Sequence, residues 1–196
     1  RATHHKGHRP RHDHGLQDQR RPPHMAQARD EGIPITTLDE AKWLDLTIDG
    51  ADEYDADLAL IKGGGGAHLQ EKIVATASDR MIVIADASKK VDTLGAFPLP
   101  VEVIPFGWQT TQALIEETLI GMDVLGREIT QRMAGPDPFI SDEGNFILDL
   151  HLKRIGNARQ LALILNQMPG VVENGLFIDV RRPVHGHHAI PFMAAP

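Results

Sequence analysis

Two aspartates three residues apart are the first candidates for chemistry in this sequence. Asp49 and Asp52 lie in the segment TIDGADE, directly after a short β-prone run from Trp43 to Ile48. In open parallel sheets, ligands bind beyond the carboxyl ends of the strands, where two carboxylates can hold hydroxyl groups and transfer protons. The alternative is an acidic turn, formed by Asp49 and Gly50, with Asp52 as a helix cap. Taken alone, the segment favours the turn.

A lysine followed by four glycines is the second candidate. Lys62 ends a short apolar run, and residues 63–66 are all glycine and lead into a helical pattern. Glycines are costly in conformational entropy, but they allow backbone N–H groups to approach an anion ahead of a helix. The run lacks the GK[ST] ending of a Walker loop and the GxGxxG pattern of a dinucleotide site. We interpret it as a binding loop rather than a flexible connector.

Glu71 and Lys89 complete the set of candidates, although each is a weak signal alone. Glu71 falls in the second turn of the predicted helix, about 200° around the helix from Leu69, which lies on its apolar stripe. It is therefore either a solvated surface glutamate, the more common case, or a group that faces a cleft above the glycines. Lys89 follows a strand-like run, as Asp49 does, so we expect both at one sheet edge.

Hydrophobic periodicity predicts the elements that position these side chains. A helix is expected over residues 67–78, with Leu69, Ile73 and Ala77 forming its core stripe. The continuous apolar run MIVIA, residues 81–85, predicts a strand that is covered on both faces. Strand, helix and strand at this spacing indicate a βαβ unit with parallel strands.

The pattern changes after residue 100. We expect strands at 101–104 and 127–132, a hairpin at 139–152 that turns at DEGN, a strand at 171–180, and helices at 110–119 and 157–166. This β-α-β-β-α-β order indicates a ferredoxin-like unit. The predicted fold class is therefore α/β. A doubly wound, Rossmann-like parallel-sheet domain would comprise residues 25–100 and part of 171–196, beside a smaller ferredoxin-like α+β domain of residues 101–178.

Charge and cysteine content exclude several classes of protein. The 196-residue chain has a net charge of −7, of which residues 1–24 carry +4 and the remainder −11. An acidic body argues against nucleic acid as the main partner. No apolar run approaches 18 residues, so we expect no membrane span. The absence of cysteine excludes disulfides and thiolate sites, and it fits a cytoplasmic location.

Histidine is concentrated at the two ends of the chain. Residues 1–24 contain six of the eleven histidines, have almost no apolar side chains and show no hydrophobic period. We therefore expect this segment to be irregular and disordered or non-native. The alternative is a metal-binding histidine tract, which would make the protein a metal-binding one. No HExxH-type spacing supports a metal site, so the first interpretation is favoured.

The middle of the chain resembles ribose-5-phosphate isomerase of the A type. The likeness runs from about residue 25 to about residue 180, and the DGADE, KGGGG, EKI and ADxSK motifs have both the residues and the spacing of that family. Later segments, DEGNFILDL and PGVVENGLF, are also similar. The resemblance implies interconversion of ribose 5-phosphate and ribulose 5-phosphate in the cytoplasm by a homodimer, with a small sugar phosphate as substrate and without metal or cofactor.

The resemblance also implies a role for each matching residue. Glu71 would be the base that moves a proton between C2 and C1, and Lys62 would stabilise the enediolate oxygen, which needs a pre-placed positive charge. The aspartates would assist ring opening and hold hydroxyl groups, and Lys89 would bind the phosphate. The implied substrate contacts are Asp49, Gly50, Ala51, Asp52, Lys62, Gly63, Gly64, Gly65 and Lys89.

Two parts of the chain depart from the family. We find no counterpart of the family's Gly-Thr-Gly-Ser-Thr phosphate loop, and residues 1–24 and 181–196 are instead rich in Arg, Pro and His. We hypothesise that both segments are translated out of frame or come from a damaged gene model. Half of the phosphate site would then be missing. The alternative to an isomerase is a non-catalytic sugar-phosphate-binding or regulatory domain of the same fold.

Overall fold

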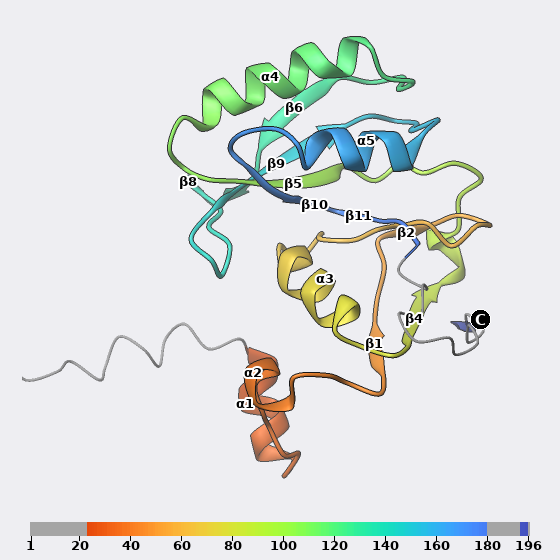
Figure 1. Cartoon of the computed structure of the whole chain (residues 1–196), viewed down its shortest axis with the longest axis vertical. Coiled ribbons are helices and arrows are strands. Elements are labelled where there is room, and N and C mark those ends of the chain that lie inside the picture. Colours follow the sequence, from red (N-terminus) through yellow and green to blue (C-terminus); the bar gives the residue numbers. More distant parts are fainter. Residues whose placement is uncertain (1–22, 180–192, 196) are drawn as a thin grey trace, which may run out of the picture. The chain divides into compact units, whose positions relative to one another are not determined.

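The computed structural model describes residues 23–179 and 193–195 of the chain (Figure 1). The hypotheses about residues 1–22, 181–192 and 196, including the histidine tract, fall outside these residues. The chain divides into two units, residues 1–41 and residues 42–196. Among the described residues, no helix is both long enough and apolar enough to cross a membrane.

The described part of the first unit, residues 23–41, contains two helices. Helix α1 (Pro23–Asp30) ends shortly before Gly32, whose φ of 69° is the left-handed conformation that commonly follows the end of a helix. Helix α2 (Leu38–Ala41) is a single turn. The backbone N–H of Glu40 donates to the hydroxyl of Thr37 over 3.2 Å, which caps the start of this turn.

A parallel sheet in the second unit carries the first predicted site residues. Strands β1 (Thr47–Asp49), β4 (Met81–Asp86) and β12 (Met193–Ala195) lie in the order β1-β4-β12, and both pairings are parallel. Helix α3 (His68–Thr76) lies between β1 and β4 in the sequence, which confirms the predicted βαβ unit. Strand β1 is shorter than the predicted strand, and Leu44 forms only an isolated bridge with Ser78.

A second small sheet places Lys62 and the glycines. Strands β2 (Glu53–Tyr54), β3 (Leu60–Ile61) and β11 (Leu176–Phe177) pair in the order β11-β3-β2 and are antiparallel. Lys62 follows β3 directly, and its backbone N–H donates to the carbonyl of Gly175 over 2.9 Å. The lysine backbone is therefore tied to the chain segment that enters β11.

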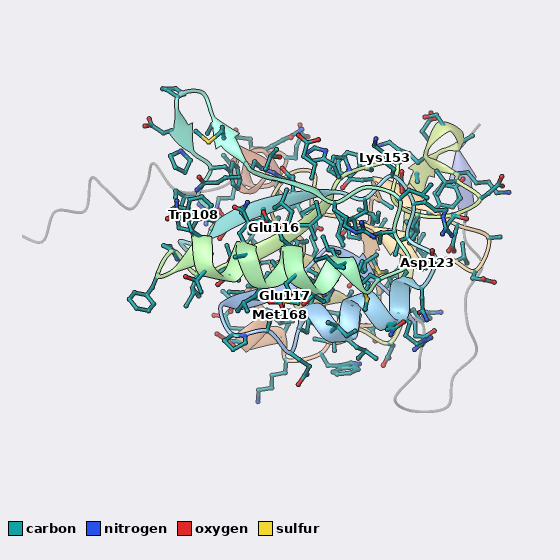
Figure 2. The ribbon with its side chains drawn as sticks, turned by 90° about the horizontal axis from the view of Figure 1, so that it is seen from above. Trp108, Glu116, Glu117, Asp123, Lys153 and Met168 are labelled. Atoms are coloured by element: carbon teal, nitrogen blue, oxygen red, sulfur yellow. The ribbon has the colours of Figure 1, made fainter. Side chains whose placement is uncertain are left out.

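The α+β unit has the predicted ferredoxin-like element order. Its elements are β5 (Leu99–Val103), α4 (Trp108–Ile120), β6 (Glu128–Gln131), β9 (Phe146–His151), α5 (Ala158–Leu165) and β10 (Val171–Asn174). The strands form an antiparallel sheet in the order β10-β5-β9-β6. Helices α4 and α5 cover one face of it (Figures 1 and 2).

Apolar side chains from both helices and from the strands form one core in this unit. Buried members include Leu99, Ile115, Leu148, Leu161 and Leu165. At the start of α4, the ring of Trp108 packs edge-to-face on Phe146 of β9, with centroids 6.1 Å apart. This core gives the sheet a rigid base from which β6 and β9 can position side chains.

The predicted hairpin over residues 139–152 is confirmed only at its turn, because no ladder of paired strands extends from it. Strand β9 pairs with β5 and β6, and the DEGN turn closes only an isolated bridge between Ile140 and Phe146. The small hairpin lies earlier, between β7 (Met133–Ala134) and β8 (Asp137–Pro138). The DEGN residues do form the predicted turn. The apolar residues that follow it belong to β9, which pairs with β5 on one side and β6 on the other, and not with the segment before the turn.

The predicted strand over residues 171–180 is divided at Gly175. Strand β10 pairs with β5, whereas β11 pairs with β3 of the other sheet. A Cβ atom at Gly175 would lie 2.3 Å from the carbonyl oxygen of Lys62, so only glycine permits this close approach. The strand therefore changes sheets at a residue that also holds the Lys62 backbone.

The predicted core stripe of α3 is also wrong. The buried residues of the helix are His68 and Ala75, while Ile73 is 50% exposed. Ala75 packs in a cluster that includes Val83 of β4 and Phe177 of β11, so the covered face of the helix is the one that carries Ala75 and not Ile73. The expectation that both faces of the MIVIA strand are covered fails as well, since Ile84 is 50% exposed.

Two leucines on α5 provide a test of the apolar core between α5 and the antiparallel sheet. Leu161 is 1% exposed and Leu163 is 63% exposed. We expect Leu161→Ala to lower the free energy of unfolding by roughly 2–5 kcal/mol, because it leaves a cavity between α5 and the sheet. The matched variant Leu163→Ala should change it by less than about 0.5 kcal/mol. Urea denaturation measures both, and similar losses would contradict the assigned packing face.

Candidate active site

The ammonium group of Lys62 joins three separate elements. Its Nζ donates to the carbonyl of Gly50 over 2.6 Å, and it lies 2.8 Å from Asp49 Oδ2 and 3.2 Å from Glu71 Oε2. The side chain is 3% exposed. The end of β1, the end of β3 and the first turn of α3 therefore meet at one buried cation.

Glu71 faces this cation rather than open solvent. Its carboxylate is partly buried, and burial is the main cause that raises its pKa above the ordinary glutamate value. The neighbouring charges of Asp49 and Asp52 raise the pKa further, whereas Lys62 lowers it. A carboxylate with a raised pKa beside a fixed cation is suited to exchange a proton with a bound ligand.

Asp52 is bonded to the glycine loop and does not cap a helix. Its Oδ2 accepts a hydrogen bond from the backbone N–H of Gly64 over 2.7 Å. Gly66 closes the loop, since its N–H donates to the carbonyl of Gly63 over 2.9 Å. Gly66 has a φ of 85°, and a Cβ there would lie 2.6 Å from the Phe139 ring, so the loop requires glycine at this position.

Lys89 lies at the same sheet edge but outside the charge cluster. It ends the short 3-10 helix of residues 87–89, directly after β4. Asp49 is level with Val83 in the parallel pairing, so β4 continues beyond the end of β1 before it reaches Lys89. No hydrogen bond or ion pair among the described residues links Lys89 to Lys62, Glu71 or the aspartates.

Sequence reasoning missed Arg132, which contacts the glycine loop. Its guanidinium donates to the carbonyls of Gly63 and Gly64, and it pairs with Asp149 of β9. Arg132 lies 68 residues from Gly64 in the sequence. No local pattern marks it, because only the β6–β9 pairing brings it to the loop.

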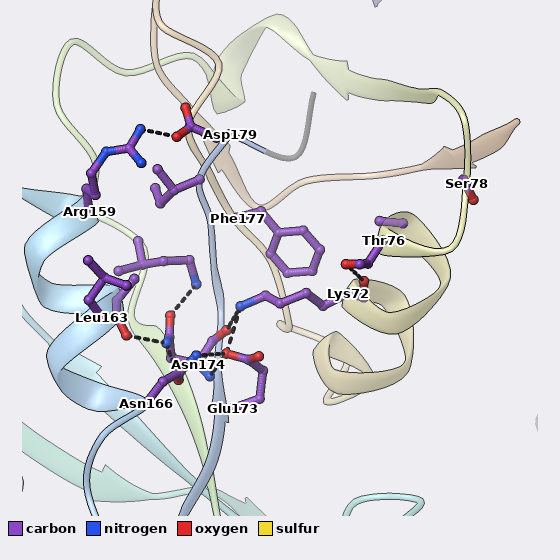
Figure 3. Close-up of a pocket in the computed structure, with 14 residues that line it drawn as sticks. Lys72, Thr76, Ser78, Arg159, Leu163, Asn166, Glu173, Asn174, Phe177 and Asp179 are labelled. Atoms are coloured by element: carbon purple, nitrogen blue, oxygen red, sulfur yellow. Dashed lines mark hydrogen bonds and ion pairs between the residues drawn. The ribbon is translucent and has the colours of Figure 1, made fainter. Parts of the chain in front are cut away.

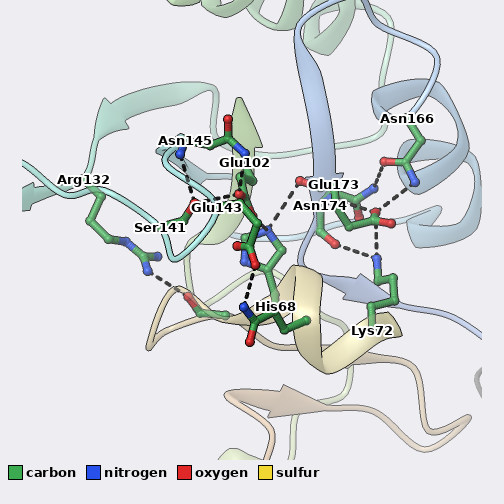
Figure 4. A network of polar contacts seen from close by, with 12 residues as sticks. His68, Lys72, Glu102, Arg132, Ser141, Glu143, Asn145, Asn166, Glu173 and Asn174 are labelled. Atoms are coloured by element: carbon green, nitrogen blue, oxygen red, sulfur yellow. Dashed lines mark hydrogen bonds and ion pairs between the residues drawn. The ribbon is translucent and has the colours of Figure 1, made fainter. Parts of the chain in front are cut away.

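A second buried polar group lies under the same loop (Figure 4). His68 is fully buried, and burial lowers its pKa to about 4, so the ring is neutral at pH 7. Its Nε2 lies 4.0 Å from Glu102 Oε2, and burial raises the pKa of Glu102. Ser141 and Asn145 donate to the other oxygen of Glu102, at 2.7 and 2.8 Å.

No metal site emerges from this polar group. Within residues 23–179 and 193–195, no three or more His, Cys, Asp or Glu side chains are placed to hold a metal ion. His68 instead packs below the loop, since a Cβ at Gly63 would lie 2.8 Å from its ring.

A separate cavity lies between α3, α5 and the β10–β11 segment (Figure 3). Lys72 lines it and donates to Glu173 Oε1 over 2.9 Å and to the carbonyl of Asn174 over 2.6 Å. The ring of Phe177 lies next to two lysines, Lys72 and Lys62. Its centroid is 4.8 Å from Lys72 Nζ and 5.4 Å from Lys62 Nζ. The cavity therefore lies beside the Lys62 cluster without including it.

The family model and the sequence relatives that this chain matches all point to one protein family. A family model described as ribose 5-phosphate isomerase A (phosphoriboisomerase A) matches residues 23–188. The chain is 78% identical over 153 residues to ribose-5-phosphate isomerase A of Ruegeria pomeroyi, and 76% identical over the same length to that of Cereibacter sphaeroides. Each match covers 78% of this chain and 58% of the relative, so the chain spans less than two thirds of their length.

Solved structures agree with the sequence relatives. A ribose 5-phosphate isomerase A from Methanocaldococcus jannaschii is 41% identical with a TM-score of 0.69, covering 78% of this chain and 66% of that one. The enzyme from Plasmodium falciparum is 36% identical with a TM-score of 0.71, covering 80% and 66%. A further isomerase structure, solved in complex with phospho-erythronic acid, is 40% identical with a TM-score of 0.71, again covering 80% and 66%.

The charges around Glu71 can be tested by two substitutions of opposite sign. Lys62→Met removes the cation, so we expect the pKa of Glu71 to rise further. Asp49→Asn removes a negative neighbour, so we expect that pKa to fall. Carboxyl ¹³C NMR titration measures both. Shifts in the same direction would show that Glu71 is not in the electrostatic field of this cluster.

The shape of the glycine loop can be tested by alanine at adjacent positions. We expect Gly66→Ala to lower the free energy of unfolding by roughly 1–3 kcal/mol, because of its positive φ and the contact with Phe139. Gly65→Ala should change it by less than about 0.5 kcal/mol, since no atom lies within 4 Å of the added methyl group. Urea denaturation measures both, and equal effects would contradict the loop conformation.

Proposed function

The chain belongs to the ribose 5-phosphate isomerase A family, and from this premise we propose that it interconverts ribose 5-phosphate and ribulose 5-phosphate. The observation that carries the proposal is the position of Lys62, whose Nζ lies within 3.2 Å of carboxylate oxygens of both Asp49 and Glu71. A base and a buried cation in contact are what an enediolate route requires, because negative charge develops on the sugar oxygen as the carbon loses its proton.

We assign Glu71 the transfer of the carbon-bound proton. As a carboxylate it would take the proton from C2 of the open-chain aldose and return it to C1, while a proton moves from the C2 hydroxyl to the C1 oxygen. Burial raises the pKa of Glu71, so it holds a proton more firmly than a solvated glutamate would. That property supports the role, since the base must keep the proton until C1 accepts it.

Lys62 would stabilise the enediolate oxygen. Its ammonium group already has three oxygen acceptors, from Gly50, Asp49 and Glu71. A substrate oxygen could replace one of them without moving the lysine, whose backbone is held by Gly175. A cation fixed before the reaction stabilises the developing charge without the cost of reorganisation.

The remaining predicted residues would bind the sugar and its phosphate. We propose that Asp49 and Asp52 assist ring opening and hold hydroxyl groups, and that the backbone of Gly50, Ala51 and residues 63–65 lines the sugar. Lys89 lies at the same carboxyl edge of the sheet, which is the expected ligand-binding edge. This position, beyond the end of β4, supports the proposal that Lys89 binds the phosphate.

Family membership also motivates proposals about the setting of the reaction. We propose that the protein works as a homodimer in the cytoplasm, on a small sugar phosphate, without metal or cofactor. Sedimentation of the purified chain tests the dimer. Turnover after exhaustive chelation tests the metal-free reaction.

Glu71→Gln separates catalysis from binding. We expect this variant to lower the rate of ribulose 5-phosphate formation by at least about 10²–10⁴-fold, because the amide cannot accept the carbon-bound proton. Binding of ribose 5-phosphate should stay within a few-fold of the unmodified chain. A coupled assay measures the rate and titration calorimetry the binding.

Glu143→Gln is the matched control. Glu143 is an exposed glutamate in the DEGN turn, and it accepts a hydrogen bond from Gln70, the neighbour of Glu71 on α3. Its substitution should leave the rate unchanged. If Glu71→Gln kept most of the rate, Glu71 would not be the base. If the unmodified chain bound ribose 5-phosphate without turnover, the non-catalytic sugar-phosphate-binding domain would be the better description.

A further inference from the structure

The side chain of Arg132 connects the antiparallel sheet to the glycine loop (Figure 4). Its Nη1 donates to the carbonyl oxygens of Gly63 and Gly64, at 2.8 and 3.1 Å. Its Nε and Nη2 donate to the two carboxylate oxygens of Asp149, at 2.9 and 2.5 Å. One guanidinium therefore makes four hydrogen bonds, two to the loop and two to a carboxylate on β9.

Both partners of this pair are themselves held in place. The backbone N–H of Arg132 donates to the carbonyl of Ile147 over 2.8 Å, and its carbonyl accepts from Phe139 over 2.9 Å. Asp149 lies in β9, which has a strand on each side. The two side chains are only 14% and 16% exposed, so solvent competes little for these bonds. A planar guanidinium bound twice by a carboxylate has a fixed orientation.

The direction of the loop amides follows from this orientation. In a trans peptide the C=O and the following N–H point in opposite directions, and no cis peptide occurs in the described chain. Holding the carbonyls of Gly63 and Gly64 on Arg132 therefore turns the N–H groups of Gly64 and Gly65 to the other side. The Gly64 N–H does meet Asp52 Oδ2 there, at 2.7 Å.

The Gly65 N–H has no acceptor within the described part of the chain, and Gly65 is exposed. The Gly65 N–H is therefore available to donate to an oxygen of a ligand, beside the Gly64 N–H that Asp52 already accepts from. Four consecutive glycines would otherwise sample many conformations, so something must select this one. The described residues offer Arg132 on one side of the loop and Asp52 on the other.

We propose that Arg132, oriented by Asp149, is a positioning residue that fixes the glycine loop so that the Gly64 and Gly65 amides face the substrate side. The statement about the substrate rests on the proposed function, whereas the statement about the loop does not. Arg132 touches the loop carbonyls and not the reacting atoms, so its effect on catalysis is indirect.

The substitution Arg132→Met, with Arg127→Met as its matched control, tests this inference. Arg127 comes directly before β6, and Arg132 comes directly after it. The Nε of Arg127 donates to the carbonyl of Leu119, near the end of α4, over 2.9 Å. Both variants remove a guanidinium that binds a backbone carbonyl from an end of the same strand. Only Arg132→Met removes a contact with the glycine loop.

Amide hydrogen exchange of the full chain, followed by NMR, is the first measurement. We expect Arg132→Met to speed exchange of the Gly64 amide by about tenfold or more, because the loop opens locally. The Lys62 amide, which donates to Gly175, should be unchanged and serves as an internal reference. Arg127→Met should change neither amide.

Steady-state kinetics with ribose 5-phosphate is the second measurement. We expect kcat/KM of Arg132→Met to fall on the order of 10²-fold, through misplacement of the loop. Arg127→Met should stay within a few-fold, at a similar melting temperature. Arg132→Lys keeps the charge without the planar fork, so it should lie between these values and remains informative if the methionine variant does not fold.

An unchanged Gly64 exchange rate in the Arg132 variants would overturn the inference. So would equal changes in the Arg127 and Arg132 variants, which would indicate a general loss of stability. If the unmodified chain shows no turnover and no sugar-phosphate binding, the proposed function fails, while the exchange rates still decide whether Arg132 fixes the loop.

Discussion

The site depends on the burial of one ammonium group. Lys62 is 3% exposed, and a charge removed from water costs several kcal/mol unless oxygen acceptors surround it. The acceptors come from Gly50 and Asp49 at the end of β1 and from Glu71 on α3. Loss of either element would remove at least one of these acceptors and leave the buried charge less well compensated. The requirement for a stable fold and the arrangement of the candidate site are therefore the same physical constraint.

The glycine loop extends this constraint to the antiparallel sheet. It starts at Lys62, the residue that carries the buried charge, and it ends where α3 begins. Asp52 holds one side of the loop through an amide, and Arg132 holds the other side through two carbonyls. A flexible sequence thus has a defined conformation because rigid elements contact it from both sides. The same chain segment, near Gly175, both enters β11 and supports the Lys62 backbone.

Much of the fold could be predicted because its signals are local. The parallel βαβ unit follows from apolar runs separated by a helical pattern, and the ferredoxin-like order follows from the spacing of strands and helices after residue 100. Errors arose where partners had to be chosen. Periodicity predicts that Ile73 of α3 faces the core, although Ala75 does, and it pairs β9 with the segment before it instead of with β5 and β6. Periodicity shows which residues share a face, but not which face another element covers.

By itself, the sequence determined the kinds of group available, their spacing and the family they resemble. It placed Asp49 after one strand-like run, Lys62 after another and Glu71 on the helix that follows, so the ligand-binding edge of a sheet was the expected place for all three. Only the tertiary structure decided that Glu71 faces Lys62 rather than solvent, since helical geometry allowed both orientations. Only the tertiary structure also brought Arg132 to Gly64 from 68 residues away. The physical reason is that a contact of this kind depends on the register of two strands and on a shared core, and neither is encoded in the residues next to it.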